Sequence, residues 1–523
     1  FPVSEGKAMH TPTVGRFEKK IDRLPFTIGF TAIFAFFVCA LFFPETLKPL
    51  MEGIQNILTK DMGWSFVFVS FMLVLLTFAI IVSPIGSIRI GGKDAKPDFG
   101  IIKWFSISLC SGIGIGILFW GIGEPIYHLM QPPVSIDVRP GSHDAALFAI
   151  SQSILHWSIA QYCIYALCGT IFALMAFNLK YPLSIMSGLA PIVPEKYQEP
   201  VKNIVHAACL FSICCAVISS CGALIMLISS CFSYLFHIGK SFFLSAAVTL
   251  FSTLFFVISS TTGLKKGMSF LSKMNTRAFF IILFFVFFCG PTLVILNMGT
   301  ECFGYMLTLF FRHSTLVSSQ ILNDHWADTW LIVYMAFFFG YGPPIGLYLA
   351  RLGKGRTVRE FLLMNVLAPS CFVYFWINTF GSLAICDQLT GTIDVWNFVQ
   401  SKGLESTVIA ILQTMPLHNI LIAVFMAVTV VSFVTLVDPM TCVLATLSIR
   451  GISAEDEAPS SLKVTWGGTM GLVALALVAL TGITALRGMA ILSGVLMMLL
   501  TLALCLSLVK VGRRICQSEG YGR

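Results

Sequence analysis

The sequence predicts an all-α polytopic membrane protein with twelve transmembrane helices. Hydrophobic residues make up 57% of its 523 residues, charged residues only 11%, and the mean hydropathy is +0.87, whereas a soluble domain carries about 25% charged residues. The apolar residues form continuous runs, not the alternating pattern of a membrane β-barrel. Lipid is therefore the solvent for most of the chain, and helices satisfy their own backbone hydrogen bonds there.

Twelve apolar runs are long enough to cross a bilayer, which takes about 20 residues. They lie at residues 26–43, 63–83, 101–123, 145–177, 203–236, 241–262, 278–297, 329–350, 360–385, 418–448, 464–485 and 488–509. Lys and Arg gather in alternate connections, at 89–103, 265–273 and 351–359, and near both termini. This pattern places those connections and both termini in the cytoplasm, which requires an even number of spans.

The remaining composition excludes other classes of partner. The net charge of +8 is explained by the basic connections, so we expect the lipid bilayer and no nucleic acid as a partner. None of the 16 cysteines has CxxC or zinc-type spacing, and we expect no disulfides. The sequence begins at Phe1 without an initiator methionine, so we expect it to be trimmed or incomplete at this end.

Two spans contain clusters of residues that interrupt helices. The third span contains GIGIG at 112–116, and the eighth contains GYGPPIG at 340–346. We predict that both spans break near mid-membrane, which in transporters marks the site for substrate and ions. The alternative is that the glycines only permit close helix packing, which the adjacent prolines make less favoured for the eighth span.

The spacing of these two spans predicts the organisation of the chain. They lie five spans apart, which suits two inverted five-helix repeats after two N-terminal helices. Residues 299–328 mix aromatic and charged side chains, which favours an amphipathic helix on the outer surface, with a solvated loop as the alternative. The predicted segments are a cytoplasmic tail (1–25), two helices with a loop (26–100), the first repeat (101–298), the surface helix (299–328), the second repeat (329–509) and a short cytoplasmic tail (510–523).

Aromatic side chains share one face of the fourth span and one face of the eighth. They are Trp157, Tyr162 and Tyr165, with Gln161, on the fourth and Tyr334, Phe337, Phe338 and Tyr341 on the eighth. Aromatic rings can hold a quaternary ammonium group by cation–π attraction. Core packing is the alternative, because a chain with 47 Phe forms such stripes by chance.

Three stretches of the sequence resemble one transporter family. GIGIGILFWGIGEPIYHLMQPP, LHWSIAQYCIY and DTWLIVYMAFFFGYGPPIGLYLARLGKGRTVREF are similar to the betaine/choline/carnitine transporter (BCCT) family, and the similarity runs from the first span to the last. The resemblance implies a LeuT-type fold and a homotrimer in a bacterial plasma (inner) membrane. It also implies transport of quaternary ammonium compounds such as glycine betaine, choline or carnitine.

The resemblance also implies a set of substrate-binding residues. They are Trp157, Tyr162, Tyr165, Phe337, Phe338 and Tyr341, with the backbone at Gly112, Gly114 and Gly116 facing a substrate carboxylate. The family has tryptophans where Phe337 and Phe338 stand here, and Trp gives the strongest cation–π attraction. We expect Glu124, where the third span ends, to be interfacial and not a substrate ligand. His156 borders the aromatic residues, and a satisfied histidine at a helix interface is favoured over a proton carrier.

A candidate sodium site follows from the same resemblance. The family uses main-chain oxygens at the positions of Cys110, Ile113 and Ser432 and two adjacent hydroxyls, of which Thr435 supplies one and Leu436 removes the other. Asp438 resembles the ion-coupled members, although pairing with a nearby base is an equal alternative. Asn275 stands where sodium-independent exchangers carry an arginine.

These features predict a secondary transporter that works by alternating access, coupled to sodium. The alternatives are a sodium-independent exchanger of the carnitine type, which Leu436 favours, and a membrane sensor that binds ligand without moving it. We find no nucleophile motif, metal cluster or phosphate loop, so we expect no enzyme activity and no cofactor other than a coupling sodium ion.

Overall fold

The computed structural model describes residues 20–114, 116–261, 269–318, 321–452, 456–480 and 482–520, and helices dominate these segments. Among the described residues no β-strand forms; two isolated bridges join Ile21 to Ile449 and Arg89 to Thr357. Twelve described helices are long and apolar enough to cross a membrane, and the bent pair α4–α5 adds a thirteenth candidate. The predicted all-helical membrane fold is confirmed.

The helices that carry these candidate spans follow one another along the chain. They are α1 (Arg23–Phe42), α3 (Gly63–Val82), the pair α4 (Ile101–Ile113) and α5 (Gly116–Met130), α6 (His143–Trp157) with α7 (Ile159–Ala173), α9 (Glu195–Phe236), α10 (Phe242–Thr261), α11 (Ser269–Cys289), α12 (Thr292–Ser314), α13 (Trp326–Thr329) with α14 (Leu331–Ala350), α15 (Val358–Thr390), α18 (His418–Leu447), α19 (Ser460–Leu480) and α20 (Gly482–Glu519). The shorter helices are α2 (Pro44–Lys60), α8 (Ile185–Leu189), α16 (Val395–Lys402) and α17 (Leu404–Gln413), with a 3₁₀ turn at Pro84–Ser87, another at Val134–Ile136 and a π-helical turn at Leu174–Asn178.

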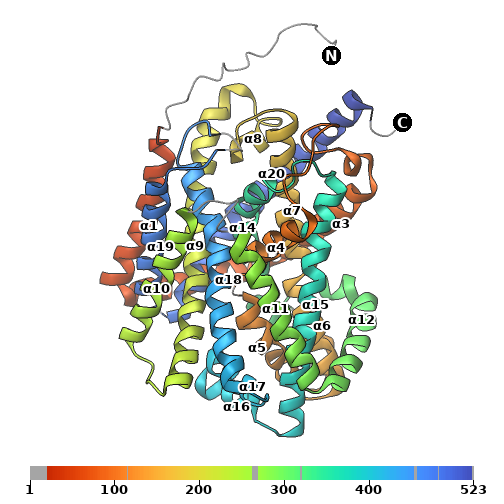
Figure 1. Cartoon of the computed structure of the whole chain (residues 1–523), viewed down its shortest axis with the longest axis vertical. Helices are drawn as coiled ribbons and strands as arrows, with labels where there is room; N and C mark the ends of the chain where they lie inside the picture. Colours follow the sequence, from red (N-terminus) through yellow and green to blue (C-terminus); the bar gives the residue numbers. More distant parts are fainter. Residues whose placement is uncertain are drawn as a thin grey trace.

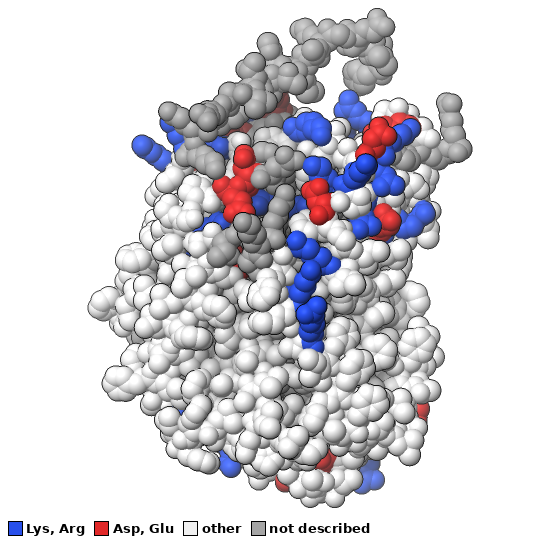
Figure 2. Space-filling view, in the orientation of Figure 1, with Lys and Arg blue, Asp and Glu red and all other residues white. Residues whose placement is uncertain are grey.

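Helix α1 begins and helix α20 ends at the same end of the molecule (Figure 1). Most of the Lys and Arg side chains visible in Figure 2 gather at this end, with one column of them reaching toward the middle, and the surface around and below that column is largely uncharged. Both features agree with an even number of crossings, because basic residues collect on the cytoplasmic side of a membrane. Thirteen candidates reduce to twelve if α12 is the predicted surface helix.

The boundaries around α11 and α12 differ from the prediction. The expected span 278–297 straddles Gly290 and Pro291, where α11 has ended and α12 has yet to begin. The helix expected at 299–328 instead runs from Thr292 to Ser314, and large apolar side chains such as Leu307 and Phe311 are exposed on it. Proline at this junction fits the first turn of α12, which needs no donor there. The C-terminal segment 510–523 is helical as far as Glu519.

The third span breaks where the glycines predicted. Helices α4 and α5 meet at an angle of 62°. Gly114 ends α4 with φ 53° and ψ −154°, a left-handed conformation that side chains other than hydrogen make costly. The break leaves the last carbonyls of α4 without helical partners.

The predicted break at 340–346 in the eighth span is wrong. Helix α14 is continuous through Pro343 and Pro344. Pro344 cannot donate to the Gly340 carbonyl, and the Ser212 hydroxyl of α9 donates to that oxygen instead at 3.0 Å. The glycines serve close packing, since a Cβ built on Gly342 would lie 2.6 Å from Ile164 on α7. The packing alternative therefore holds for this span.

An interruption that the sequence did not predict lies in the fourth span. Ser158 separates α6 from α7 with φ −118° and ψ −120°, directly after Trp157. Helix α14 lies against α7 and α20, and nearly all of its residues are buried. The breaks in the third and fourth spans therefore meet the buried helix α14 in the interior of the bundle.

Candidate functional site

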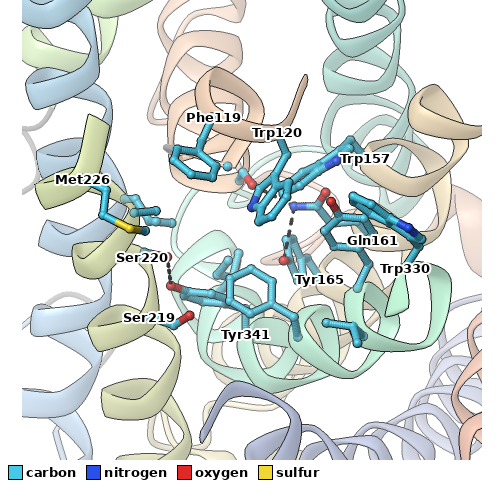
Figure 3. Close-up of a pocket in the computed structure, with 18 of the residues that line it drawn as sticks. Phe119, Trp120, Trp157, Gln161, Tyr165, Ser219, Ser220, Met226, Trp330 and Tyr341 are labelled. Atoms are coloured by element: carbon cyan, nitrogen blue, oxygen red, sulfur yellow. Dashed lines mark hydrogen bonds between the residues drawn. The ribbon is translucent and has the colours of Figure 1, made fainter. Parts of the chain in front are cut away.

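A partly open cavity lies where the broken spans meet α9 and α14. Its empty volume is about 950 Å³, counting its open mouth. The lining residues come from eight described helices and the Trp330 junction, and Figure 3 shows most of them around a common space. They are Gly112 of α4, Gly116, Phe119 and Trp120 of α5, Trp157 of α6, Gln161 and Tyr165 of α7, Ser219, Ser220, Ala223 and Met226 of α9, Thr329 and Trp330, Val333, Tyr334, Phe337, Tyr341 and Ile345 of the eighth span, and Leu436 of α18. We name this space the aromatic cavity.

Aromatic rings form most of the wall and hold one another in edge-to-face contacts. Trp120 meets Trp330 with ring centroids 5.9 Å apart and planes at 89°. Trp157 meets Tyr334 at 5.0 Å, and Phe337 meets Tyr341 at 5.2 Å. Such pairs fix ring orientations beyond what burial alone provides. The wall therefore presents π faces and edges in fixed orientations.

Few polar groups interrupt this wall. Gln161 donates through Nε2 to the Gly112 carbonyl at 3.0 Å and to the Tyr165 hydroxyl at 3.3 Å. Ser220 and the Tyr341 hydroxyl share a hydrogen bond of 2.9 Å (Figure 3). The break in the third span frees the Gly112 carbonyl, and Gln161 satisfies it. No charged residue is among the described residues that line the cavity.

Most of the predicted substrate-binding residues line the aromatic cavity, and three do not. Those in the wall are Trp157, Tyr165, Phe337, Tyr341, Gly112 and Gly116. Tyr162 lies behind the wall, with its ring 3.0 Å from a Cβ built on Gly112. Phe338 packs behind Tyr334 with near-parallel rings 6.1 Å apart, and Gly114 faces the Leu436 side chain.

Sequence reasoning missed four aromatic or polar groups that shape the wall. Phe119 and Trp120 follow the glycine cluster by one turn, and Trp330 precedes Tyr334 by one turn. Extending the stripe of the eighth span backwards would have found Trp330, because positions 330, 334, 337 and 341 share one helical face. Nothing in the sequence pointed to Ser220, which is one of several serines on the long helix α9.

The residues of the candidate sodium site come together from α4, α11 and α18. Asn275 donates through Nδ2 to Ser432 Oγ at 3.0 Å and lies 3.7 Å from Cys110 Sγ. Thr435 donates through Oγ1 to the Ser432 carbonyl at 3.1 Å. Cys110 and Ile113 are in the last turn of α4, whose carbonyls have no onward helical partner. Oxygen atoms suited to a hard cation are therefore concentrated here.

Two neighbours of this group differ in chemistry. Leu436 contributes an apolar side chain that packs on the break, 2.7 Å from a Cβ built on Gly114. Asp438 is fully buried and accepts a hydrogen bond from the Ser259 hydroxyl of α10. Its Oδ1 has no hydrogen-bond partner among the described residues. The nearby base Lys463 pairs with Glu457 at 3.4 Å.

A buried carboxylate stands directly behind the aromatic cavity, where the sequence predicted an interfacial residue. Glu124 of α5 is fully buried, which corrects that expectation. Its Oε2 accepts from Trp157 Nε1 and from the Tyr334 hydroxyl, each at 2.8 Å. Its Oε1 contacts His128 Nε2 at 3.0 Å and His156 Nδ1 at 2.5 Å. We name these five residues the Glu124 cluster.

The Glu124 cluster is also the described group whose atoms could hold a metal ion. One atom each from Glu124, His128 and His156 lies within 4.8 Å of the others. Two of the separations are hydrogen-bond distances, however, and both carboxylate oxygens already accept hydrogen bonds. The geometry is that of a carboxylate saturated by donors.

Comparison with known proteins places these features in context. The family model described as "BCCT, betaine/carnitine/choline family transporter" matches residues 25–515. The chain is 28% identical to the glycine betaine transporter OpuD of Bacillus subtilis over 91% of this chain and 92% of that protein. It is 29% identical to the osmo-independent choline transporter BetT1 of Acinetobacter baylyi over 86% of each.

More distant relatives carry other names. The ectoine/hydroxyectoine transporter of Virgibacillus pantothenticus is 25% identical over 90% of this chain and 92% of its own. Among solved structures, a Na⁺-coupled sialic acid symporter aligns over 94% of this chain and 98% of its own, with 11% identity and a TM-score of 0.35. A score of that size supports no conclusion about mechanism.

Proposed function

Because this chain belongs to the betaine/carnitine/choline transporter family, a family of transporters and not of enzymes, we propose that it is a secondary active transporter of betaine-like quaternary ammonium compounds. Its substrates are of the glycine betaine, choline or carnitine type, and it works by alternating access. We propose further that it moves its substrate together with sodium.

The observation that carries this proposal is the aromatic cavity beside the broken third span. A quaternary ammonium group has no N–H to donate, so π faces and edges are its main polar contacts. The cavity offers such rings on several sides, including Trp120, Trp157 and Trp330. Trp120 and Trp330, which were not predicted, add indole rings to the wall and offset the phenylalanine at 337.

Sodium symport is supported by the group around the end of α4. Carbonyls of Cys110 and Ile113 and the oxygens of Ser432 and Thr435 would hold the ion, and Asn275 beside them is neutral, so it does not replace a cation. Leu436 favours the alternative, a sodium-independent exchanger, because it provides no oxygen. Asp438 stands nearby, and its Oδ1 has no hydrogen-bond partner within the described part of the chain.

The cellular setting belongs to the same proposal. We place the protein in a bacterial plasma membrane as a homotrimer with both termini in the cytoplasm. The shared end of α1 and α20 and the basic side chains gathered there support this orientation.

Uptake into proteoliposomes tests the function. Labelled choline, glycine betaine and carnitine are offered with and without an inward sodium gradient. We expect concentrative uptake of at least one of them that collapses without the gradient. Uptake that ignores sodium but requires internal substrate would support the exchanger. Binding without any flux would support a sensor, and neither binding nor flux of any of the three would refute the substrate assignment.

A further inference from the structure

The Glu124 cluster joins a buried carboxylate to two residues of the cavity wall. Trp157 and Tyr334 each use their only N–H or O–H to bind Glu124 Oε2. Both rings line the aromatic cavity, and they also touch each other at 5.0 Å. The carboxylate therefore fixes the orientation of two wall rings that come from different helices, α6 and α14.

The hydrogen bonds around Glu124 define its charge. The Trp157 indole can only donate, so Oε2 is an acceptor. The Gln152 amide nitrogen lies 3.0 Å from His156 Nε2 and donates to it, which leaves the His156 proton on Nδ1 facing Glu124 Oε1. An ionised carboxylate accepts from all four neighbours, whereas a protonated one would lose an acceptor.

The two histidines do not cancel this charge. With the Gln152 amide nitrogen turned toward it, His156 Nε2 accepts a hydrogen bond, as a neutral imidazole does. His128 donates to Glu124 through Nε2, and its Nδ1 has no hydrogen-bond partner among the described residues. A second proton on that buried nitrogen would be left without an acceptor, which is costly. The cluster therefore carries one net negative charge.

No charged residue among the described lining residues offsets this negative charge. The described lining residues include no Lys, Arg, Asp or Glu, so no fixed cation awaits a substrate carboxylate there. A buried anion acts through a low dielectric and attracts a cation in the adjoining space more strongly than it would in water. A zwitterion brings its carboxylate into the same field, and the buried anion repels that carboxylate. Its electrostatic gain in binding free energy is therefore smaller.

We propose that Glu124 is the fixed negative charge of the aromatic cavity and a positioning residue for Trp157 and Tyr334. Through that charge the cavity prefers quaternary ammonium compounds with a net positive charge, the choline class, over zwitterions of the glycine betaine class. This inference rests on the proposed function of the cavity and adds the residue that sets its preference.

Equilibrium binding to the purified full chain in detergent tests the charge. Radiolabelled choline is the reporter, and glycine betaine and 3,3-dimethylbutan-1-ol, the neutral carbon isostere of choline, are the competitors. In the unaltered protein we expect choline to bind about tenfold more tightly than either competitor. In Glu124→Gln we expect both ratios to fall by about fivefold or more, since the shape is kept and the charge is lost.

Tyr334→Phe is the matched control, because it removes one hydrogen bond to Glu124 and keeps the charge and the ring. We expect it to weaken all three probes together, with both ratios within about twofold of the unaltered protein. Unchanged ratios in Glu124→Gln would overturn the proposal, because they would show that the charge at Glu124 does not set the preference of the cavity.

If Glu124→Gln does not fold, as judged by size-exclusion chromatography, the binding ratios of the unaltered protein test the proposed preference. Glycine betaine binding as tightly as choline there refutes the preference but leaves the transporter assignment standing. The proposed function itself fails only if labelled choline, glycine betaine and carnitine all neither bind nor are taken up, and the two failures are therefore distinct.

Discussion

The third and eighth spans carry similar clusters of glycine, yet one breaks and the other stays straight. At Gly114 the chain turns into a left-handed conformation, and α4 and α5 diverge by 62°. At Pro343 and Pro344 the helix continues, although proline removes backbone donors. The comparison teaches that the outcome depends on the neighbours that receive the freed groups and on the space beside each glycine.

Different neighbours stabilise the two spans. In the third span Gln161 binds the carbonyl that the break frees, and the Trp157 ring fills the space beside Gly116. In the eighth span Ser212 binds the carbonyl that Pro344 cannot reach. The first arrangement opens a cavity, and the second builds a straight wall for it.

Within the comparison of the two spans, paired glycine substitutions give the largest expected effect. In Gly116→Ala the new Cβ would collide with the Trp157 ring, so we expect substrate affinity in uptake assays to fall about tenfold or more. In Gly342→Ala the collision is with Ile164 outside the cavity, so we expect unchanged affinity and a loss of about 1–3 kcal/mol in stability.

Gly304→Ala is the control for both, because nothing lies within 4 Å of the added Cβ on α12. This variant should lower neither the substrate affinity nor the unfolding temperature. Equal losses of affinity in Gly116→Ala and Gly342→Ala would erase the distinction between the two spans.

A second prediction tests the eighth span by removing the Ser212 hydroxyl, which binds the backbone of α14. Ser212→Ala leaves the buried Gly340 carbonyl unsatisfied, which should cost about 1–3 kcal/mol. Thermal unfolding in detergent measures this loss. Ser230→Ala on the same helix is the control, because that hydroxyl binds only the Met226 carbonyl one turn earlier. A drop no larger than the control's would show that α14 tolerates its prolines without Ser212.

The N-terminal end of α9 provides the smallest expected effect. Asp22 binds Lys202 of α9 at 3.0 Å and Arg450 at 3.1 Å. Burial opposes ionisation of Asp22, but the two cations outweigh it and hold its pKa below the usual 3.8. A lowered carboxyl pKa stabilises the fold above the unfolded value, and this stability is lost as the pH falls through the folded pKa.

We therefore expect Asp22→Asn to cost about 1 kcal/mol at neutral pH, because Arg450 is 60% exposed and solvent screens its pair with Asp22. The difference in unfolding temperature between the unaltered protein and the variant should shrink below about pH 4. A difference that stays constant from pH 6 to pH 3 would contradict a role for the Asp22 charge.

Much of the fold could be predicted because lipid imposes a simple rule on the sequence. Long apolar runs and basic connections predict the spans, and Gly112, Gly114 and Gly116 predict the broken one. The straight eighth span could not be predicted, since Ser212 lies far away in the sequence and its contact appears only in three dimensions. The interruption at Ser158 could not be predicted either, because no proline or glycine lies beside it in the sequence.

The site was predicted in part for the same reason. Helical spacing placed Trp157 and Tyr165 on one face, but the break at Ser158 shifts the register between them and leaves Tyr162 behind the wall. Glu124 resembled an interfacial residue because Pro125 follows it. Its burial depends on donors from α6 and α14, which no local pattern reveals.

Binding of labelled choline and glycine betaine to purified protein, with a tryptophan removed from the wall, tests the central claim most directly. The claim is that the broken third span and the aromatic cavity form the substrate site. Loss of a desolvated cation–π contact of about 2 kcal/mol predicts roughly 30-fold weaker binding in Trp120→Ala. Trp64→Ala, 62% exposed on α3, should bind as the unaltered protein does. Undiminished binding in Trp120→Ala would contradict the account.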